Sequence, residues 1–335
     1  MYSPGRMRLF LLTFSHLSRV GSRVKNQLYE HGILQPRKPP LPVISVGNIS
    51  LGGSGKTPLA VEILTWLVGR GRRPALVSRG YRGNWEKKGG VLSDGKRILS
   101  DWRDGGDEPF LVAKSVPGAG VFVGKDRLSS CRRAAELGFD IAVLDDGFQH
   151  RRLARDLDIV LFSPQEKIAL REPASSLKRA DVVLVEKESL ARQRTKNALR
   201  RLDRDPFTYS VVSRGFFELP SGTPMPTTEL VRMRVLAFCG IARPQRFRDQ
   251  LLRGGLEPVS FLAFPDHHAY PARSLAKIAR AGRDSRAEAA VTTEKDAVKL
   301  AGRQDPLGPL PVYLLRIGLE VEAGFYQRLI SLLCR

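Results

Sequence analysis

The chain has 335 residues, of which 42% are hydrophobic and 27% are charged, so it is expected to be a soluble globular protein with room for two domains. The formal net charge of +21 calls for an acidic partner, and because the basic residues are scattered without interleaved aromatics, we expect a phosphorylated substrate or an anionic membrane and no nucleic acid. The three cysteines form no CxxC pair, which argues against a disulfide framework or a zinc motif and favours idle thiols in a reducing cytoplasm.

Residues 1–35 are predicted to form a basic amphipathic helix. Its uncharged run, residues 9–18, is shorter than the roughly 20 residues of a bilayer span, and no secretory cleavage site follows. Such a helix can lie in a membrane interface or pack onto its own domain, and the pattern alone leaves both open. The apolar positions at helical spacing are Met7, Phe10, Leu11, Phe14, Leu17, Val24 and Leu28.

The sequence from Ser45 to Pro58 is predicted to be a phosphate-binding loop between a strand and a helix. Its glycines let backbone amides surround phosphate oxygens, and the helix N-terminus adds partial positive charge. Lys56 is expected to contact the β- and γ-phosphates, and the Thr57 hydroxyl to hold Mg²⁺. One position departs from the general pattern, which has Gly where this chain has Ser50. The candidate nucleotide-binding residues are Ser50, Gly52, Gly53, Ser54, Gly55, Lys56 and Thr57.

A second strand is predicted at residues 74–78, followed by an irregular stretch to Gly106. Gly106-Asp107-Glu108-Pro109 then opens a helix, where carboxylates can simply be caps that the helix dipole favours. A further strand at 121–123 and a helix at 129–137 follow.

The stretch from Asp140 to His150 predicts a buried parallel strand that ends in Asp145 and Asp146. Enzymes with a phosphate-binding loop hold Mg²⁺ with an acid at such a strand end. The sequence therefore predicts a metal site at Asp145 and Asp146, without deciding which carboxylate binds the ion.

Two more strands are predicted at 158–162 and 181–185, with Leu170-Arg171-Glu172-Pro173 between them. Residues 208–212 and 215–219 are expected to pair as a small hairpin, and the Pro/Gly/Thr-rich run 220–228 to be a linker.

A second α/β unit begins at Val231, with strands predicted at 234–238, 259–262, 289–292 and 312–315 and a closing helix at 325–333. Ligands of open α/β sheets bind at the carboxyl ends of the strands, so we expect a site between the two units. His267 and His268 follow one strand next to Asp266, where they can be solvated residues or can orient a catalytic carboxylate. No third ligand at a known spacing supports a metal role for them.

The nucleotide is predicted to be ATP. A GTPase would carry an Asn/Thr-Lys-x-Asp signature, which neither Thr195-Lys196-Asn197-Ala198 nor Glu294-Lys295-Asp296 fits. Motifs in both halves suggest that a second substrate binds between the domains, as in a kinase.

Taken together, these motifs resemble the tetraacyldisaccharide 4'-kinase family, the lipid A 4'-kinases, and they occur in family order over nearly the whole chain. Ser50 also fits that family, whose loop commonly begins with Ser or Thr. The matching strings are Val46-Gly47-Asn48, Gly52 to Pro58, Ser78-Arg79-Gly80-Tyr81, Gly106-Asp107-Glu108-Pro109, Asp145 to His150, Leu170-Arg171-Glu172-Pro173, Phe238 to Ala242, Phe264-Pro265-Asp266-His267-His268 and Thr292 to Asp296.

The resemblance implies an α/β fold, with a P-loop NTPase-type parallel-sheet domain and a second, smaller αβα domain joined by a short β linker. The expected divisions are the N-terminal helix at 1–35, the P-loop kinase domain at 36–204, the β-hairpin and linker at 205–230 and the second domain at 231–335. The implied reaction is ATP-dependent phosphorylation of the 4'-hydroxyl of a tetraacyldisaccharide 1-phosphate, which forms lipid IVA in lipid A biosynthesis.

The resemblance also implies where the protein works and which residues act. It would be a peripheral or monotopic protein at the cytoplasmic face of the inner membrane, with an anionic phosphoglycolipid substrate and no obligate protein partner evident. Asp107 would accept the proton of the sugar hydroxyl, and His267 would support Asp107 as its partner. The sequence alone does not distinguish His267 from His268 in this role. Arg171, with Arg127 as the second candidate, would neutralise charge on the transferring phosphoryl group.

Two other classes stay open at this point. A P-loop GTPase or ATPase switch, such as a metallochaperone, would differ in nucleotide preference and would transfer no phosphate to lipid. An ATP-dependent scaffold on nucleic acid would account for the charge of +21 and would bind DNA in a strongly salt-dependent way.

Overall fold

The computed structural model describes residues 27–29, 31–50, 55–163, 170–200, 202, 205–300, 302–303 and 305–333. Most of the predicted N-terminal helix, residues 1–26, lies outside the described residues, as do Gly52, Gly53 and Ser54 of the phosphate-binding loop. In the part of the chain that is described, no helix combines the length and the apolar character needed to cross a membrane.

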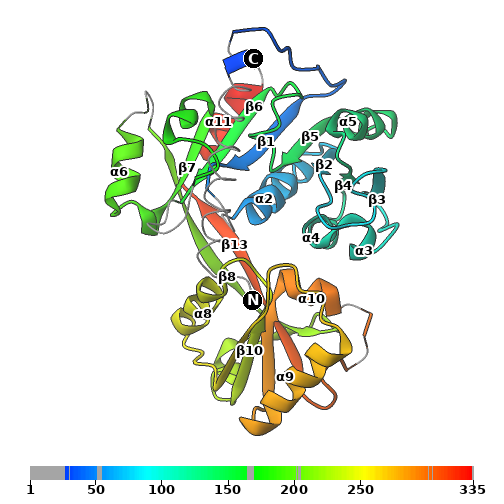
Figure 1. Ribbon diagram of the computed structural model, residues 1–335, viewed down its shortest axis with the longest axis vertical. Coiled ribbons are helices and arrows are strands. Elements are labelled where there is room, and N and C mark those ends of the chain that lie inside the picture. The colour runs from blue at the N-terminus through cyan, green and yellow to red at the C-terminus, as the bar shows by residue number, and fades with distance from the viewer. Residues whose placement is uncertain are drawn as a thin grey trace, which may run out of the picture.

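One continuous sheet runs through a larger and a smaller lobe, in the order β11-β10-β12-β13-β8-β7-β6-β1-β5-β2-β4-β3 (Figure 1). In the larger lobe, β7, β6, β1, β5, β2 and β4 pair in parallel and β3 closes the edge antiparallel. The strands are nearly continuous apolar runs because helices cover both faces. Their bounds are β1 Val43–Asn48, β2 Pro74–Ser78, β3 Gly90–Asp94, β4 Gly120–Val123, β5 Ile141–Asp145, β6 Leu157–Phe162 and β7 Val182–Glu186.

The helices of the larger lobe form two layers. On one face α2 (Lys56–Val68), α4 (Asp107–Ser115) and the C-terminal α11 (Phe325–Leu333) pack in one apolar cluster with β1, β5 and β6. On the other face lie α5 (Arg127–Glu136) and, beyond it, the short helices η1 (Ala174–Arg179) and α6 (Gln193–Leu199). The short segments α3 (Trp102–Gly105) and η2 (Lys187–Ser189) complete this lobe.

The smaller lobe repeats the three-layer plan on four parallel strands, β11 (Ser260–Ala263), β10 (Val235–Cys239), β12 (Ala289–Thr293) and β13 (Val312–Val321). The helix α8 (Pro244–Arg253) packs on one face, and α9 (Ala272–Asp284) and α10 (Glu294–Leu300) lie on the other. The predicted fold class, two α/β units of unequal size joined by β structure, is therefore confirmed. The exact domain divisions remain a prediction.

The expected hairpin at residues 208–219 is wrong, because these residues form one long strand, β8 (Phe207–Leu219). β8 pairs with β7 at its start and runs antiparallel to β13 along its length, so two strands connect the lobes (Figure 1). Gly215 has φ 103°, a conformation that favours glycine. A β-bulge beside it lets β8 continue through the residues that were predicted to form the hairpin turn. The supposed linker contains a short strand, β9 (Pro224–Met225), which pairs with β8, and the short helix α7 (Thr227–Leu230).

A glycine in β1 lets the turn after β5 lie directly against the strand. A Cβ added at Gly47 would stand 2.5 Å from Cβ and 2.9 Å from the backbone nitrogen of Phe148, which is fully buried. The amide of Gly147 also donates to the carbonyl of Val46 at 3.2 Å. These contacts fix the turn that carries Asp145 and Asp146 beside the start of the phosphate-binding loop.

We expect Gly47→Ala to lower the free energy of unfolding by about 1–3 kcal/mol, because the added methyl meets backbone atoms that cannot move away. Gly69→Ala is the matched control, since Gly69 has φ −61° and an added Cβ would make only ordinary contacts there. Chemical denaturation of both variants checks this. Equal stabilities would show that the turn does not depend on close packing against β1.

Candidate functional site

The phosphate-binding loop ends at Gly55, whose φ of 85° suits glycine, and α2 begins at the next residue. No side chain among the described residues caps α2, and its first turn holds no acidic residue. The N-terminal amides and the partial positive charge of this helix are therefore directed at the loop, where an anion binds well.

Lys56 is held by two oxygen atoms at the base of the loop. Its Nζ lies 3.1 Å from Oδ1 of Asn48 and 3.2 Å from Oδ1 of Asp146. Ser50 is buried, and its carbonyl accepts a hydrogen bond from the Asn48 side chain at 2.8 Å. Thr57 is half-buried on the same turn of α2. The described part of the loop thus gathers an ammonium, a hydroxyl and helix amides in one place.

The two carboxylates after β5 have different surroundings. Asp146 has φ 52° and accepts hydrogen bonds from Nη1 of Arg171 on both oxygens, at 3.1 and 2.8 Å. Burial alone would raise the pKa of Asp146, but Lys56 and Arg171 outweigh it and lower the pKa below its ordinary value. Asp146 therefore stays ionised and organises two cations next to the loop.

Asp145 is buried at the end of β5, where the Ser78 hydroxyl approaches one of its oxygens at 3.4 Å. Burial, together with the negative charges of Glu108 and Asp146, raises the pKa of Asp145 to about 7. Its other oxygen, Oδ1, has no hydrogen-bond partner among the described residues.

A divalent cation suits this corner of the site. A buried carboxylate oxygen without a donor is costly unless a cation compensates it, and oxygen ligands are those that Mg²⁺ prefers. The described residues contain no cluster of three His, Cys, Asp or Glu side chains that could hold a metal. An ion here would take few protein ligands and rely on water and phosphate oxygens, as Mg²⁺ commonly does.

Asp107 meets the smaller lobe at the first residue of α4. It is only 5% exposed, and Nδ1 of His267 lies 3.1 and 3.0 Å from its two carboxylate oxygens. Gly106 precedes Asp107 and has φ 91°, a conformation that favours glycine. The helix α4 therefore begins at Asp107 itself. The residue from the larger lobe and the histidine from the loop after β11 are thus brought together across 160 positions of sequence.

Lysines on α10 surround this pair. Lys295 contacts Oε1 of Glu108 at 2.8 Å and Nε2 of His267 at 3.4 Å. Because an ammonium can only donate, its position favours the tautomer in which Nε2 accepts and Nδ1–H donates to Asp107. Burial would raise the pKa of Asp107, but His267, Lys295 and Lys299 outweigh it and hold the pKa well below the ordinary value.

His268 faces away from Asp107. Its Nε2 lies 2.8 Å from Oγ of Ser274, and its ring stacks on Phe264 at 4.7 Å between ring centroids. Burial, helped by Lys299, lowers the pKa of His268. This histidine belongs to the packing of the smaller lobe, so only its neighbour His267 lies where it can act on the carboxylate.

Sequence reasoning gave no role to Lys295 or Lys299, although Lys295 stands in one of the matching strings. Arg127, which it did consider, is buried at the start of α5 and donates to the carbonyl of Gly124 at 3.0 Å. Burial lowers the pKa of Arg127, and the charge of Asp145 acts in the opposite direction. Glu108 and Asp266, which both face Lys295, complete the charged cluster.

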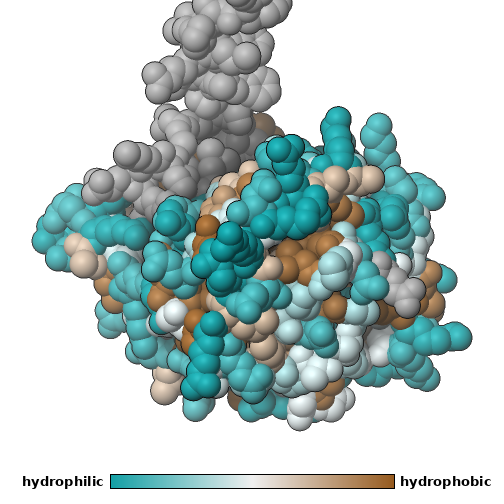
Figure 2. Space-filling model, turned by 90° about the horizontal axis from the view of Figure 1, so that it is seen from below, coloured by the Kyte–Doolittle hydropathy of each residue, from teal (hydrophilic) through white to brown (hydrophobic). Residues whose placement is uncertain are grey.

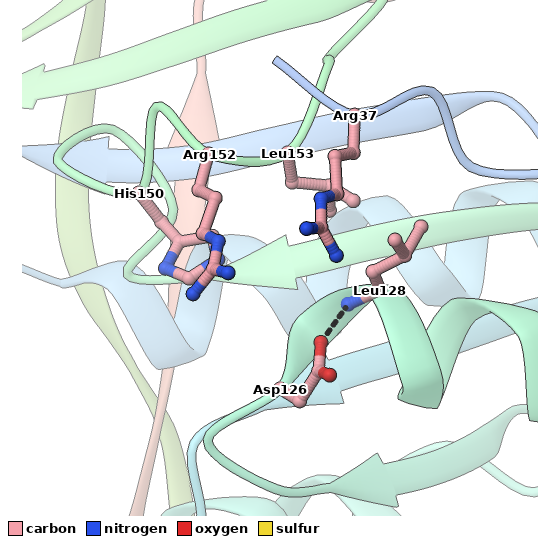
Figure 3. Close-up of a pocket in the computed structure, with 6 residues that line it drawn as sticks. All are labelled: Arg37, Asp126, Leu128, His150, Arg152 and Leu153. Carbon is pink, nitrogen blue, oxygen red and sulfur yellow. Dashed lines mark hydrogen bonds between the residues drawn. The ribbon is translucent and has the colours of Figure 1, made fainter. Parts of the chain in front are cut away.

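A separate small hollow lies on the larger lobe, between the start of α5 and the turn after β5 (Figure 3). Its volume of about 20 Å³ holds a single water molecule and excludes a nucleotide or a lipid. Asp126 in its wall caps α5 through the Leu128 amide at 3.1 Å. The lining residues are Arg37, Asp126, Leu128, His150, Arg152 and Leu153.

Comparison with known proteins gives one consistent family. The family model of LpxK, tetraacyldisaccharide-1-P 4'-kinase, matches residues 7–334. The tetraacyldisaccharide 4'-kinase of Syntrophus aciditrophicus is 39% identical over 94% of this chain and 89% of its own. That of Pelobacter propionicus is 41% identical over 90% of this chain and 86% of its own. A crystal structure of LpxK from Aquifex aeolicus in complex with ATP superposes with a TM-score of 0.73 at 29% identity, covering 98% of this chain and 99% of that one.

In metal-free protein we expect Asp145→Asn to raise the free energy of unfolding at pH 8 by roughly 2–4 kcal/mol and to change it little near pH 4. The folded pKa of Asp145 lies above its unfolded value, so its ionisation costs stability as the pH rises through the interval between them.

Denaturant titrations from about pH 4 to 8 in the presence of a chelator measure this. Asp284→Asn is the control, because that carboxylate is 70% exposed and its neutralisation should change stability by less than about 0.5 kcal/mol at every pH. A gain for Asp145→Asn that does not vary with pH would contradict the assignment.

Proposed function

The chain belongs to the tetraacyldisaccharide-1-P 4'-kinase family, and from this membership we infer that it transfers the γ-phosphate of ATP to the 4'-hydroxyl of a tetraacyldisaccharide 1-phosphate. The product of that step is lipid IVA, on the route to lipid A. The base, the nucleotide site, the metal site and the membrane contact are proposed from this chain's own residues.

The observation that supports this chemistry best is the pairing of Asp107 with His267 across the two lobes, at 3.0 Å. The buried carboxylate is ionised and can accept the proton of a sugar hydroxyl as the oxygen attacks phosphorus. The imidazole Nδ1–H lies 3.1 and 3.0 Å from the two carboxylate oxygens and so restrains the orientation of the carboxylate plane. Asp107 is the proposed base, and His267 its orienting partner.

The nucleotide is proposed to lie on the loop that ends at α2. Backbone amides of the glycine-rich loop and the Lys56 ammonium bind the phosphates, with Asn48 and Asp146 keeping the lysine extended. Arg171, fixed by its two hydrogen bonds to Asp146, neutralises charge on the phosphoryl group in the transition state. Arg127 is the second candidate for this role, since its positive charge interacts with Asp145 and Asp146.

Mg²⁺ is proposed to bind Thr57 and the carboxylates after β5. Asp145 is the stronger candidate ligand, because its Oδ1 is buried without a donor among the described residues, whereas Asp146 is engaged by Lys56 and Arg171. When bound, the ion would neutralise negative charge on the phosphate oxygens.

The protein is proposed to work at an anionic membrane surface, which for this pathway is the cytoplasmic face of the inner membrane. The net charge of +21 and the amphipathic pattern of residues 1–26 support this, because a basic amphipathic helix binds anionic lipid by both its faces. Figure 2 shows a mostly hydrophilic surface with hydrophobic residues interspersed on the face of the molecule seen from below. The contact is proposed to involve the N-terminal segment, because its sequence combines an apolar stripe with basic residues.

We expect purified protein to transfer labelled γ-phosphate from ATP to tetraacyldisaccharide 1-phosphate in detergent micelles. Asp107→Asn should reduce kcat by about 10²–10⁴-fold and leave ATP affinity nearly unchanged, since the base is lost and the phosphate site is kept. Lys56→Ala should instead weaken nucleotide binding as well as turnover.

His268→Asn is the control for the base assignment, since it removes the neighbouring imidazole without touching Asp107. Near-parent turnover in Asp107→Asn would refute the proposed base. Hydrolysis of ATP or GTP without any lipid product would favour a nucleotide switch.

We expect the parent protein to co-sediment with vesicles that contain anionic phospholipid and to dissociate as the salt concentration rises. The double change Phe10→Glu and Phe14→Glu places charges on the apolar stripe and should reduce the bound fraction about tenfold or more. His16→Glu and Asn26→Glu, which add the same charge on the opposite face of the predicted helix, are the matched control. Equal loss in both pairs would show that net charge, not an inserted helix face, accounts for binding.

A further inference from the structure

We propose that Lys299, on α10 of the smaller lobe, is a positioning residue for the phosphoryl transfer, whose buried ammonium fixes and electrostatically supports the Asp107 carboxylate from across the lobe boundary. The inference rests on the proposed role of Asp107 as base and goes beyond the pair formed with His267.

The ammonium of Lys299 lies between two carboxylates. Its Nζ is 3.3 Å from Oδ2 of Asp107 and 3.0 Å from Oδ1 of Asp296, and its side chain is 1% exposed. Lysine is almost never fully buried unless it is paired, so this residue has a specific electrostatic task. The contact to Asp107 is made at the oxygen that His267 approaches most closely, at 3.0 Å.

Asp296, on the same helix α10, fixes the position of the Lys299 ammonium. It is fully buried, and its Oδ2 accepts hydrogen bonds from the Gly240 amide at 2.9 Å and the Thr293 hydroxyl at 2.7 Å. Its Oδ1 is left to receive the lysine. The anchor for Lys299 therefore lies entirely within the smaller lobe, whereas the carboxylate that it supports belongs to the larger lobe.

The charges around Asp107 explain why such a cation is needed. ATP and a phosphorylated substrate would bring further negative charge to a site that already holds several carboxylates, and each added anion makes a buried carboxylate harder to keep ionised. Lys295 is engaged with Glu108 at 2.8 Å, while Lys299 contacts Asp107 itself. The ionisable side chains that contact Asp107 are His267 and Lys299, and those that contact this pair or the neighbouring Lys295 are Tyr81, Glu108, Asp266 and Asp296.

The pH profile of kcat/KM for the transfer to tetraacyldisaccharide 1-phosphate separates this role from simple packing. Activity requires ionised Asp107, so it falls as the pH drops through the pKa of that carboxyl, which the cations hold low. In Lys299→Met the acid limb should move upward by about 1–3 pH units, because an opposite charge next to the base is lost. The loss of kcat/KM should be largest at the acid end of the measured range and should disappear by neutral pH, where the carboxyl is ionised in both proteins.

A double variant keeps the test possible if Lys299→Met alone does not fold. Lys299→Met leaves Asp296 buried beside an apolar side chain, so Lys299→Met with Asp296→Asn removes both charges and should fold better, with an upward shift that is smaller because a neighbouring anion is lost as well. Lys299→Arg keeps the charge and should return the acid limb to within about half a pH unit of the parent, even if its larger side chain lowers kcat. ATP binding and the melting temperature are measured for each variant.

Arg253→Met is the matched control, because it breaks a different contact between the lobes. Arg253 pairs with Glu188 at 2.5 Å, and both side chains are exposed to solvent. It should leave the acid limb unmoved. A uniform loss of activity at every pH in the folded Lys299 variants would overturn the proposal and leave Lys299 a packing residue. If Asp107→Asn itself keeps near-parent turnover, the proposed base fails first, and a shifted limb in Lys299→Met would then belong to another group.

Discussion

The register of two parallel strands determines the nucleotide side of the site. β1 and β5 pair so that Val46 lies beside Asp145, and both strands end at the same edge of the sheet. The phosphate-binding loop follows the first strand and the carboxylates follow the second, which brings Lys56 and Asp146 within 3.2 Å. This arrangement requires glycine at position 47, because a larger residue would push the turn at Phe148 away from β1.

Closely spaced carboxylates then impose an electrostatic constraint, which the chain meets in two different ways. Asp146 and Asp107 each have two or more cationic or hydrogen-bonding partners, and these lower the pKa of both despite burial. Among the described residues Asp145 has no such partner on Oδ1, and its pKa is raised. The described protein groups compensate the first two carboxylates, whereas the third would gain from a cation that binds at Oδ1.

Much of this arrangement could be predicted from the sequence, because it depends on short stretches of chain. The loop before α2, the acid after β5 and the fold class all follow from local patterns of glycine, apolar and acidic residues. The hairpin prediction failed because Gly215 resembles a turn, while the partner of β8 is β13, about a hundred residues later. β3 was missed for a similar reason, since its five residues carry only a weak apolar signal and pair at the edge with β4.

The choice between His267 and His268 and the role of Lys299 depend on contacts that no local pattern encodes. Adjacent histidines after a strand look alike in sequence, yet the left-handed backbone of His267, φ 62°, sends one ring to Asp107 while the other packs on Phe264.

The proposed base, Asp107, meets its charged partners where the two lobes meet. Asp107 comes from the larger lobe, whereas His267, Lys295 and Lys299 all come from the smaller one. Further pairs cross the boundary away from the base, including Arg246 with Glu186 and Arg82 with the carbonyl of Asp266 at 3.0 Å. β8 and β13 join the lobes within the described residues, and Val298 of α10 is buried in the same apolar cluster as α4, so polar and apolar contacts together hold Asp107 against its partners. The proposed nucleotide site therefore lies in the larger lobe, while the proposed base depends on residues of both lobes.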